Sequence, residues 1–338
     1  MSADELRPES WTLHLSGLIL PLVLIASNLV GGFWVASGII LALVVYPILD
    51  IVSGPSKKNN RPAAGDGRPY EVLLVLHVLL HLVVLTTLIW RVSNAGIGWI
   101  SLLAALSTGV SAGASGIITA HELGHRKPGS LRWRLSRILL WSVHYLHYTT
   151  EHNHNHHRSV GTTADPASAP AERGLWVHIC QTIPRQFTSA WKIHESKGKR
   201  GPHNPVLHGL FIEVWTLISL WTWLGTSVAL AWIIQGVFAI LLLEYVNYIR
   251  HYGLRREKGE RQTHMHSWQT EVRWSNWTLL SVTLHPAHHM KASLPFWRLE
   301  AYPDAPTLPS GYYGCFWPCV IPPVWKRWMR PRLKYYGY

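Results

Sequence analysis

Nine histidines fall into four short clusters, and long apolar stretches make up much of the remaining chain. The nine are His121 and His125 in HELGH, His152, His156 and His157 in EHNHNHH, His251 in NYIRHYGL, and His285, His288 and His289 in HPAHH. Histidine is the commonest metal ligand near neutral pH. Because nine imidazoles exceed what one four-coordinate metal uses, the pattern predicts a site for two metal ions.

Spacing within the first two clusters predicts how their side chains face. His121 and His125 are four residues apart, so on a helix they point in the same direction. His152 and His156 repeat this spacing and are expected to act as a second pair. His157 adds an adjacent ring that is expected to reach a neighbouring metal.

The last two clusters follow the same logic. His285, His288 and His289 are spaced by three and four residues, which places them on one helical face. Pro286 lies inside this motif, but proline is tolerated in the first turn of a helix, so the ligand set stays intact. His251 follows the last apolar stretch, in helical register with Glu244 and Asn247 seven and four residues earlier, and is predicted to be the ninth ligand.

Three carboxylates lie beside these clusters: Glu122, Glu151 and Glu244. A histidine that binds a metal usually donates its other ring N–H to a carboxylate or a carbonyl, which fixes the orientation and basicity of the ring. These glutamates are candidates for that supporting role. The alternative is that they are surface charges or charges in the first turn of a helix, and the site does not need a carboxylate bound directly to a metal.

Eight other histidines are predicted to have roles outside the ligand set. His154 is offset by two residues from His152 and His156, so it is expected to face the solvent. Four more lie near the clusters as supporting or surface groups: His144, His147, His264 and His266. Three fall in or near apolar stretches and are predicted to form hydrogen bonds between helices: His14, His77 and His81.

Apolar stretches of about 20 residues are long enough to cross a bilayer as helices. Six are predicted, in three hairpins: Trp11–Leu29, Phe33–Val52, Val72–Trp90, Ile97–Ala120, Leu207–Leu224 and Thr226–Tyr245. The predicted organisation is four membrane helices over 1–120, a histidine-rich segment over 121–205, two membrane helices over 206–246 and a C-terminal segment over 247–338. The N-terminal segment lacks the layout of a cleavable signal peptide.

Composition agrees with a membrane protein. Of 338 residues, 48% are hydrophobic and 14% are charged, and the 19 Trp and 13 Tyr suit a membrane–water interface. The net charge of +13 indicates an anionic lipid surface or an acidic partner, while the apolar spans argue against nucleic acid. The three cysteines form no CxxC pair and indicate a reducing compartment.

Loop charge predicts the orientation. Lys57, Lys58, Arg61 and Arg68 lie between the second and third spans, whereas the loops near Gly31, Asn94 and Gly225 carry almost no charge apart from Arg91. Positively charged loops remain in the cytoplasm. Both termini and all four histidine clusters are therefore expected on the cytoplasmic side of the inner membrane.

The motifs in this order resemble those of the membrane alkane 1-monooxygenases. The resemblance rests on HELGH, EHNxxHH, LExxNYxxHYGL and the final HxxHH, with PILD at 47–50, TTADPAS at 162–168, HSW at 266–268 and DAPTLPSGY at 304–312. It covers roughly residues 40–330. After HSW the chain reads QTEVRW, where hydrocarbon hydroxylases carry an Asn-rich stretch, and this departure bears on the substrate more than on the chemistry.

The resemblance implies an all-α fold, a six-helix transmembrane bundle with a cytoplasmic di-iron cap, fed by a hydrophobic tunnel. It places all nine histidines among the ligands of two iron ions, with O2 as co-substrate. The implied reaction is hydroxylation of an unactivated, terminal C–H bond of an alkane or alkyl-substituted hydrocarbon. The implied partners are membrane lipid and a rubredoxin or ferredoxin-type electron donor with its reductase.

Two other functions remain open at this point. A related enzyme acting on lipid chains, such as a fatty-acyl desaturase or fatty-acid hydroxylase, would use the same metal chemistry. A basic residue lining the tunnel to hold a carboxylate would favour it. A metal or haem transporter would instead carry its histidines at membrane depth along the spans.

Overall fold

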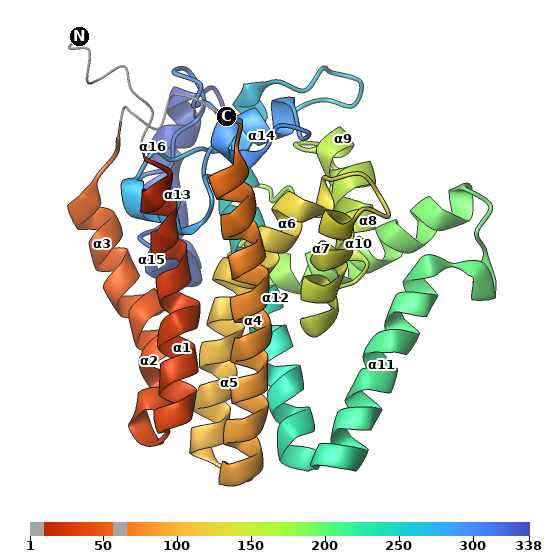
Figure 1. Ribbon diagram of the computed structural model, residues 1–338. Coiled ribbons are helices and arrows are strands. Elements are labelled where there is room, and N and C mark those ends of the chain that lie inside the picture. Colours follow the sequence, from red (N-terminus) through yellow and green to blue (C-terminus); the bar gives the residue numbers. More distant parts are fainter. Residues whose placement is uncertain (1–9, 57–65) are drawn as a thin grey trace.

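The computed structural model describes residues 10–56 and 66–338, which fold into a bundle of helices (Figure 1). The α-helices are α1 (Ile19–Val30), α2 (Ser37–Ile40), α3 (Tyr46–Ser53), α4 (Arg68–Ala95), α5 (Trp99–Ser111), α6 (Ile118–Gly124), α7 (Leu131–Ser142), α8 (Tyr148–Glu151), α9 (His157–Ser159), α10 (Leu175–Ser196), α11 (Pro205–Leu224), α12 (Thr226–His251), α13 (Arg273–Thr278), α14 (His285–Met290), α15 (Phe316–Val320) and α16 (Pro322–Tyr335). The described residues contain no strand, so the predicted all-α class is confirmed.

Shorter helical turns join or interrupt these elements. The 3₁₀ segments are η2 (Trp11–Leu18), η3 (Gly32–Ala36), η8 (Gly201–His203), η9 (His264–His266) and η10 (Phe296–Arg298). The π-helical segments are η4 (Leu41–Val45), η6 (Ala112–Ile117) and η7 (His152–His156). Single π-turns inside α-helices are often found at functional sites.

Six continuous helical stretches in the described part of the chain are long and apolar enough to cross a membrane. They are Trp11–Val30, Gly32–Ser53, Arg68–Ala95, Trp99–Gly124, Pro205–Leu224 and Thr226–His251. The predicted number of six spans is therefore confirmed. The fourth and sixth spans extend further than predicted, so that His121 and His251 lie in their last turns.

Glycines form the turns at the end of the bundle away from the histidines. Gly31 follows α1 with φ +79°, Gly96 follows α4 with φ +68°, and Gly225 lies between α11 and α12 with φ +92°. An L-residue with a side chain rarely adopts these angles, whereas glycine does so at little cost. These three turns close the hairpins without a long loop.

The helices pack unequally. α5 and α12 lie side by side, and α1 packs on α4. Figure 1 shows that α11 diverges from the bundle, and that the gap is widest at the start of the helix, where the chain arrives from α10. The buried residues of α11 are Val206 and Gly209, both near its start, so the helix presents apolar side chains such as Phe211 and Trp215 to its surroundings.

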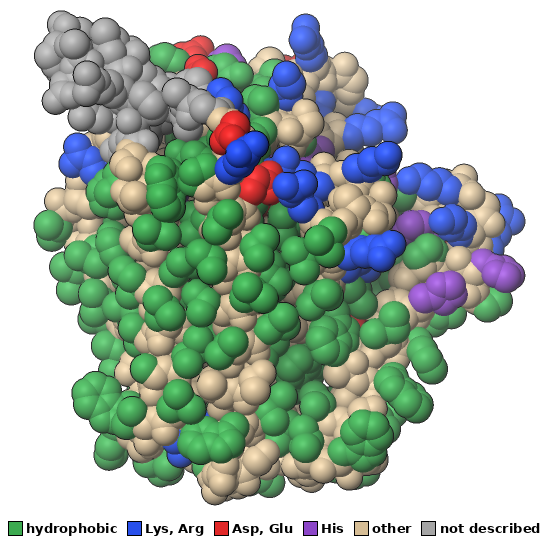
Figure 2. All heavy atoms as spheres, viewed as in Figure 1, with side chains coloured by type: hydrophobic (Ala, Val, Ile, Leu, Met, Phe, Trp, Pro, Cys, Tyr) green, Lys and Arg blue, Asp and Glu red, His purple; other side chains and the backbone are tan. Residues whose placement is uncertain are grey.

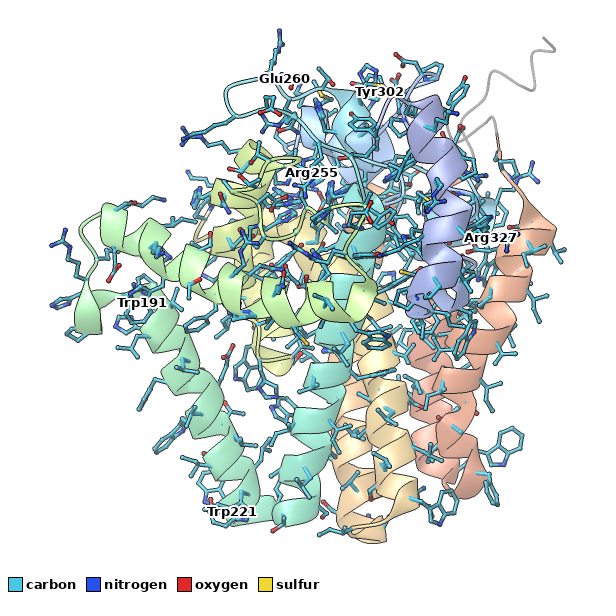
Figure 3. The ribbon with its side chains drawn as sticks, turned by 180° about the vertical axis from the view of Figure 1, so that it is seen from behind. Trp191, Trp221, Arg255, Glu260, Tyr302 and Arg327 are labelled. Carbon is cyan, nitrogen blue, oxygen red and sulfur yellow. The ribbon has the colours of Figure 1, made fainter. Side chains whose placement is uncertain are left out.

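Charge and hydrophobicity divide the surface into two zones. Figure 2 shows hydrophobic side chains over the long helices and lysines and arginines gathered at the end opposite the glycine turns. Figure 3 places Arg255 and Glu260 at that charged end, far from Trp221 on α11. Lys57, Lys58 and Arg61, which contributed to the predicted orientation, lie outside the described residues.

Three buried histidines join helices to one another, as predicted. His77 Nδ1 lies 2.7 Å from Ser115 Oγ, and His81 Nε2 lies 2.8 Å from Ser142 Oγ. His14 Nδ1 lies 3.1 Å from the carbonyl oxygen of Trp277 in α13. Buried polar groups must be hydrogen-bonded to avoid a large desolvation cost, and these bonds fix the first and third spans in place.

Candidate metal centre

The first histidine cluster is carried by the end of the fourth span. The π-helical turn η6 ends at Ile117, and α6 continues the helix to Gly124, so that His121 lies in α6 and His125 directly follows it. Their ring centroids are 5.1 Å apart. The predicted pair at four-residue spacing is therefore formed. Because α12 packs along α5, the end of the sixth span brings His251 to the same end of the bundle.

The second cluster differs from the prediction. His152 to His156 form the π-helix η7, whose hydrogen bonds join residues five apart. The side chain that shares a direction with His152 is consequently His157, and their Nε2 atoms are 3.0 Å apart. His152 and His156 also lie close together, with stacked rings whose centroids are 5.1 Å apart, but the expectation that they act as one pair is not met, because they belong to different groups. His156 instead joins a different group of histidines.

The fourth cluster forms the short helix α14. Pro286 occupies its first turn, where its missing N–H is not needed, and this matches the expectation for that residue. His285, His288 and His289 are all buried. His288 points to the first cluster, whereas His285 and His289 face His251.

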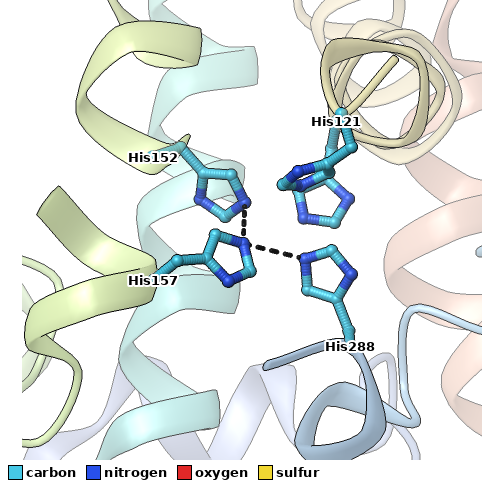
Figure 4. A group of neighbouring side chains, drawn as sticks. His121, His152, His157 and His288 are labelled. Atoms are coloured by element: carbon cyan, nitrogen blue, oxygen red, sulfur yellow. Dashed lines mark hydrogen bonds between the residues drawn. The ribbon is translucent and has the colours of Figure 1, made fainter. Parts of the chain in front are cut away.

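All nine histidines therefore gather in two adjoining groups. The first group is His121, His125, His152, His157 and His288, and the second is His156, His251, His285 and His289. Within each group, one nitrogen of every ring lies within 4.8 Å of the corresponding nitrogen of every other ring. Figure 4 shows rings of the first group facing one another from three separate parts of the chain.

Close contacts between ring nitrogens mark the interior of both groups. His157 Nε2 lies 3.0 Å from His152 Nε2 and 3.1 Å from His288 Nε2. In the second group, His285 Nε2 lies 3.1 Å from His251 Nε2 and 3.0 Å from His289 Nε2. His157 and His289 connect the two groups, with ring centroids 4.6 Å apart.

The outer nitrogens of several rings have partners away from the interior. His152 Nδ1 lies 3.4 Å from the Tyr148 hydroxyl, and His251 Nδ1 lies 3.3 Å from the carbonyl oxygen of His266. The Nε2 atoms of His121 and His125 are buried without a hydrogen-bond partner. Outward hydrogen bonds from Nδ1 with an inward-facing Nε2 are typical of histidines that bind a metal. Imidazole groups of this kind suit iron, zinc, copper or nickel.

The protonation of the rings is consistent with metal binding. Burial, and then the nearby Arg126 and His156, lower the pKa of His125 to about 4. Burial also lowers the pKa values of His152, His285 and His288 well below the ordinary value. Neutral imidazole is the form that binds a metal, and these rings are neutral at pH 7.

Asp165 is a supporting residue that the sequence analysis did not single out, although it lies in the TTADPAS stretch. His156 Nδ1 lies 3.0 Å from Asp165 Oδ2, and both side chains are buried. Ser168 Oγ donates to the same oxygen at 2.6 Å. Burial opposes charge on both groups, but their mutual attraction prevails: it lowers the pKa of Asp165 and raises the pKa of His156. Asp165 thereby orients His156 so that Nε2 remains for the second group.

The three glutamates form other hydrogen bonds. Glu122 accepts from Arg126 at 3.1 Å, and Glu151 accepts from Asn155 at 2.8 Å. Glu244 accepts from Tyr145 at 3.2 Å and from Gln186 at 2.9 Å. Glu122 still lies beside the first group, because it lines a small cavity together with His121 and His288.

The histidines predicted to lie outside the ligand set are found elsewhere. His154 is exposed, as expected from its two-residue offset. His264 pairs with Asp304 at 2.9 Å on the surface, and the His144 ring lies 3.2 Å from the carbonyl oxygen of Trp232. His147 packs against Tyr145 and Phe187. His266 contributes through its backbone carbonyl, which accepts from His251.

Two cavities lie near the end of the fourth span, and the smaller one touches the first group. An apolar cavity of about 60 Å³ lies between η4, the fourth span and α12, and its lining has no charged residue. A cavity of about 10 Å³ lies against His121 and His288. Within the described chain, Ile118 lines both. One helical face carries Ala114, Ile117 and Ile118 along the first cavity and continues to His121.

The fold and the site together define a class: a helical protein with six spans and a histidine-lined candidate metal centre at one end. A profile of the fatty acid desaturase family matches residues 97–318. Alkane 1-monooxygenase 1 of Pseudomonas aeruginosa is 34% identical over 330 residues, covering 90% of this chain and 84% of that protein.

Two further relatives define the group more closely. Alkane 1-monooxygenase of Pseudomonas putida is 32% identical, covering 89% of this chain and 81% of its own length. The xylene/toluene monooxygenase hydroxylase component XylM of Pseudomonas putida is 25% identical, covering 87% of this chain and 81% of its own length. The chain belongs to the membrane alkane 1-monooxygenases within the fatty acid desaturase family. It is an integral membrane protein.

Proposed function

We propose that this chain is a di-iron monooxygenase that hydroxylates an apolar hydrocarbon with O2 and electrons from an external carrier. The observation that carries the proposal is two adjoining histidine groups, the first of which lies against a small cavity that shares Ile118 with a larger uncharged cavity. When bound there, two iron ions would supply the chemistry that activates O2, by which O2, a C–H bond, two external electrons and two protons give an alcohol and water.

The chain's own residues would hold, orient and isolate the reactants. The nine histidines would hold the two ions, with five in the first group and four in the second. Tyr148, Asp165 and the carbonyl of His266 would orient their rings. The apolar walls of the cavity would exclude water and admit a hydrocarbon from the bilayer. Because no Lys or Arg lines this cavity, it offers no partner for a carboxylate and favours a hydrocarbon over a fatty acid.

The proposed orientation places the histidine groups on the cytoplasmic side of the inner membrane. Lysines and arginines gather at that end of the molecule (Figure 2), whereas Arg91 lies near the glycine turns at the other end. Positive charge is retained on the cytoplasmic side of bacterial membranes. A soluble donor such as a rubredoxin or ferredoxin, with its reductase, could then reach the metal centre.

Reconstitution tests the proposed reaction. The purified, iron-loaded chain, supplied with an alkane, O2, NADH, rubredoxin and rubredoxin reductase, should form the corresponding primary alcohol, detected by gas chromatography. Omitting rubredoxin should abolish the product, since the described residues hold no other redox site besides the histidine groups. Hydroxylation of a fatty acid in preference to the alkane would contradict the proposed substrate class.

Metal analysis tests the two-site arrangement. Protein expressed with adequate iron should contain about two irons per chain, because the nine rings divide into two groups that each suit one ion. Mössbauer spectroscopy should detect two iron sites that interact magnetically. One zinc and no iron per chain would refute the assignment.

Ile118 should control which carbon reaches the metal centre, since it lies between the two cavities. Ile118→Ala should widen the passage and shift hydroxylation from the terminal carbon to internal positions, with turnover changed less than about tenfold, or about 1.4 kcal/mol in the barrier. Leu43→Ala is the matched control, because Leu43 lines only the apolar cavity. Gas chromatography of the products should show a changed positional ratio in the first variant alone. An unchanged ratio in both would exclude this role.

A further inference from the structure

A second, strongly basic hollow lies on the charged end of the molecule. Its volume is about 970 Å³, and it is formed by η7, α9, the 162–166 loop, α10 and the 256–259 loop. Five cationic side chains line it: Arg158, Arg185, Lys192, Arg256 and Lys258. None of its lining residues is Asp or Glu. A concave surface with charge of one sign concentrates its field and attracts partners of the opposite charge.

The wall of this hollow is next to the second histidine group. Asn155 lines the hollow, and the residue that follows it in η7 is His156. Ala164 and Pro166 also line it, and between them lies Asp165, which bonds to His156 Nδ1 at 3.0 Å. Two separate chain segments therefore connect the hollow to His156: Asn155 through the peptide bond, and the 164–166 loop through the hydrogen bond of Asp165.

Two of the arginines that line the hollow already form hydrogen bonds with backbone carbonyls of the protein. Arg185 donates to the carbonyl of Thr163 at 3.0 Å, and Arg256 donates to the carbonyls of Val160 and Arg158 at 2.6 Å each. They are thus not arranged to enclose one small anion. Instead, the positive charge is spread across three chain segments, which suits a broad acidic surface.

We propose that this hollow is the docking site of a small acidic redox protein that delivers electrons to the adjoining histidine groups through η7 and α9. This inference rests on the proposed function, because it assigns a place to the electron donor which that function requires. Charge complementarity at the rim speeds encounter and makes binding sensitive to salt. The hydrogen bond between Asp165 and His156 connects the hollow to the second group, and Arg158 in its lining directly follows His157 of the first group.

A second basic surface on α16 provides a matched control. Lys326, Arg327 and Arg330 lie on this helix, and none of them lines the hollow. Figure 3 shows Arg327 on the opposite side of the molecule from Trp191, which lies on α10 beside Lys192. Both surfaces carry the same sign of charge, so general attraction of an acidic protein would not distinguish them.

Direct binding tests the docking site without requiring turnover. The iron-loaded full chain, in nanodiscs of zwitterionic lipid, is titrated with zinc-substituted rubredoxin, which cannot transfer electrons. The double variant Lys192→Glu/Lys258→Glu should weaken binding at least about tenfold in 50 mM salt. The control Lys326→Glu/Arg330→Glu should remain within about twofold of the unaltered chain. The difference should shrink in 500 mM salt, where screening reaches a few Å.

Each outcome is decisive for the docking site. Equal weakening by both double variants, or by neither, overturns it, as does the absence of binding to the unaltered chain. Iron content is measured in every variant to detect misfolding. Lys192→Gln/Lys258→Gln removes the two charges without reversing them, so it should weaken binding less than the glutamate variant does. Failure of hydroxylation with intact, hollow-dependent binding would reject the proposed function and leave the docking site in place.

Discussion

Replacing His157 with alanine should abolish hydroxylation and remove iron from the protein. His157 Nε2 lies 3.0 Å from His152 and 3.1 Å from His288, and its ring is 4.6 Å from that of His289. It therefore lies where the two groups meet. Loss of an outer hydrogen bond to a ligand already costs 10- to 100-fold in metal affinity, so loss of this ligand should cost on the order of 100-fold or more. Iron analysis and product formation measure both effects.

His154→Ala is the control for this variant. His154 lies in the π-helix η7, three residues before His157 at the start of α9, but its side chain is exposed and belongs to neither group. The variant should keep most of its iron and, because the neutral ring adds no fixed charge to the basic hollow that it lines, most of its activity. Comparable loss in both variants would mean that the substitutions act by disrupting η7, and the ligand assignment of His157 would fail.

The spans, the first histidine pair and the exposure of His154 could all be predicted from the sequence. The six spans follow from the length and composition of the apolar stretches, since few other structures can satisfy the backbone in a bilayer. His121 and His125 face together because α6 is regular around them. The exposure of His154 was predictable too, because an offset of two residues turns a side chain away in either an α- or a π-helix.

The partition of the second cluster could not be predicted. EHNHNHH fits an α-helix as well as a π-helix, and in the α-form His152 would pair with His156. The choice between them depends on packing: His157 meets His288 of α14 and His156 meets Asp165 of the loop that follows. Both contacts join residues whose proximity only the tertiary fold creates. The five-residue hydrogen-bond spacing of the π-helix therefore determines which histidine group each ring joins.

Asp165 was missed for a related reason. It lies nine residues after His156 in a polar loop, without a helical or strand pattern to indicate its direction. Its orientation arises from the turn in which Ala167 N donates to Oδ1 at 3.0 Å and Ser168 Oγ donates to Oδ2. The glutamates adjacent in sequence to the histidines were more conspicuous, but their hydrogen bonds go to Arg126, Asn155 and Gln186.

Asp165→Asn should lower the iron affinity of the second group by about 10- to 100-fold, the usual cost of removing a carboxylate that supports a metal-binding histidine. The amide nitrogen of asparagine can donate to His156 Nδ1, which would favour the tautomer with its proton on Nε2. That proton would occupy the position that must bind the metal. Iron titration of the metal-free protein should show one weakened site of two, and Mössbauer spectra should show partial loss of one iron species.

Asp304→Asn is the matched control, because Asp304 also forms a hydrogen bond with a histidine, His264, at 2.9 Å. That pair lies on the surface, and neither residue belongs to the two groups. Iron affinity should therefore stay unchanged. Equal affinities in both aspartate variants would show that His156 is held in place by its neighbours in η7 and not by Asp165. Selective weakening in Asp165→Asn would establish that a loop residue distant from the four motifs determines how the second group binds its metal.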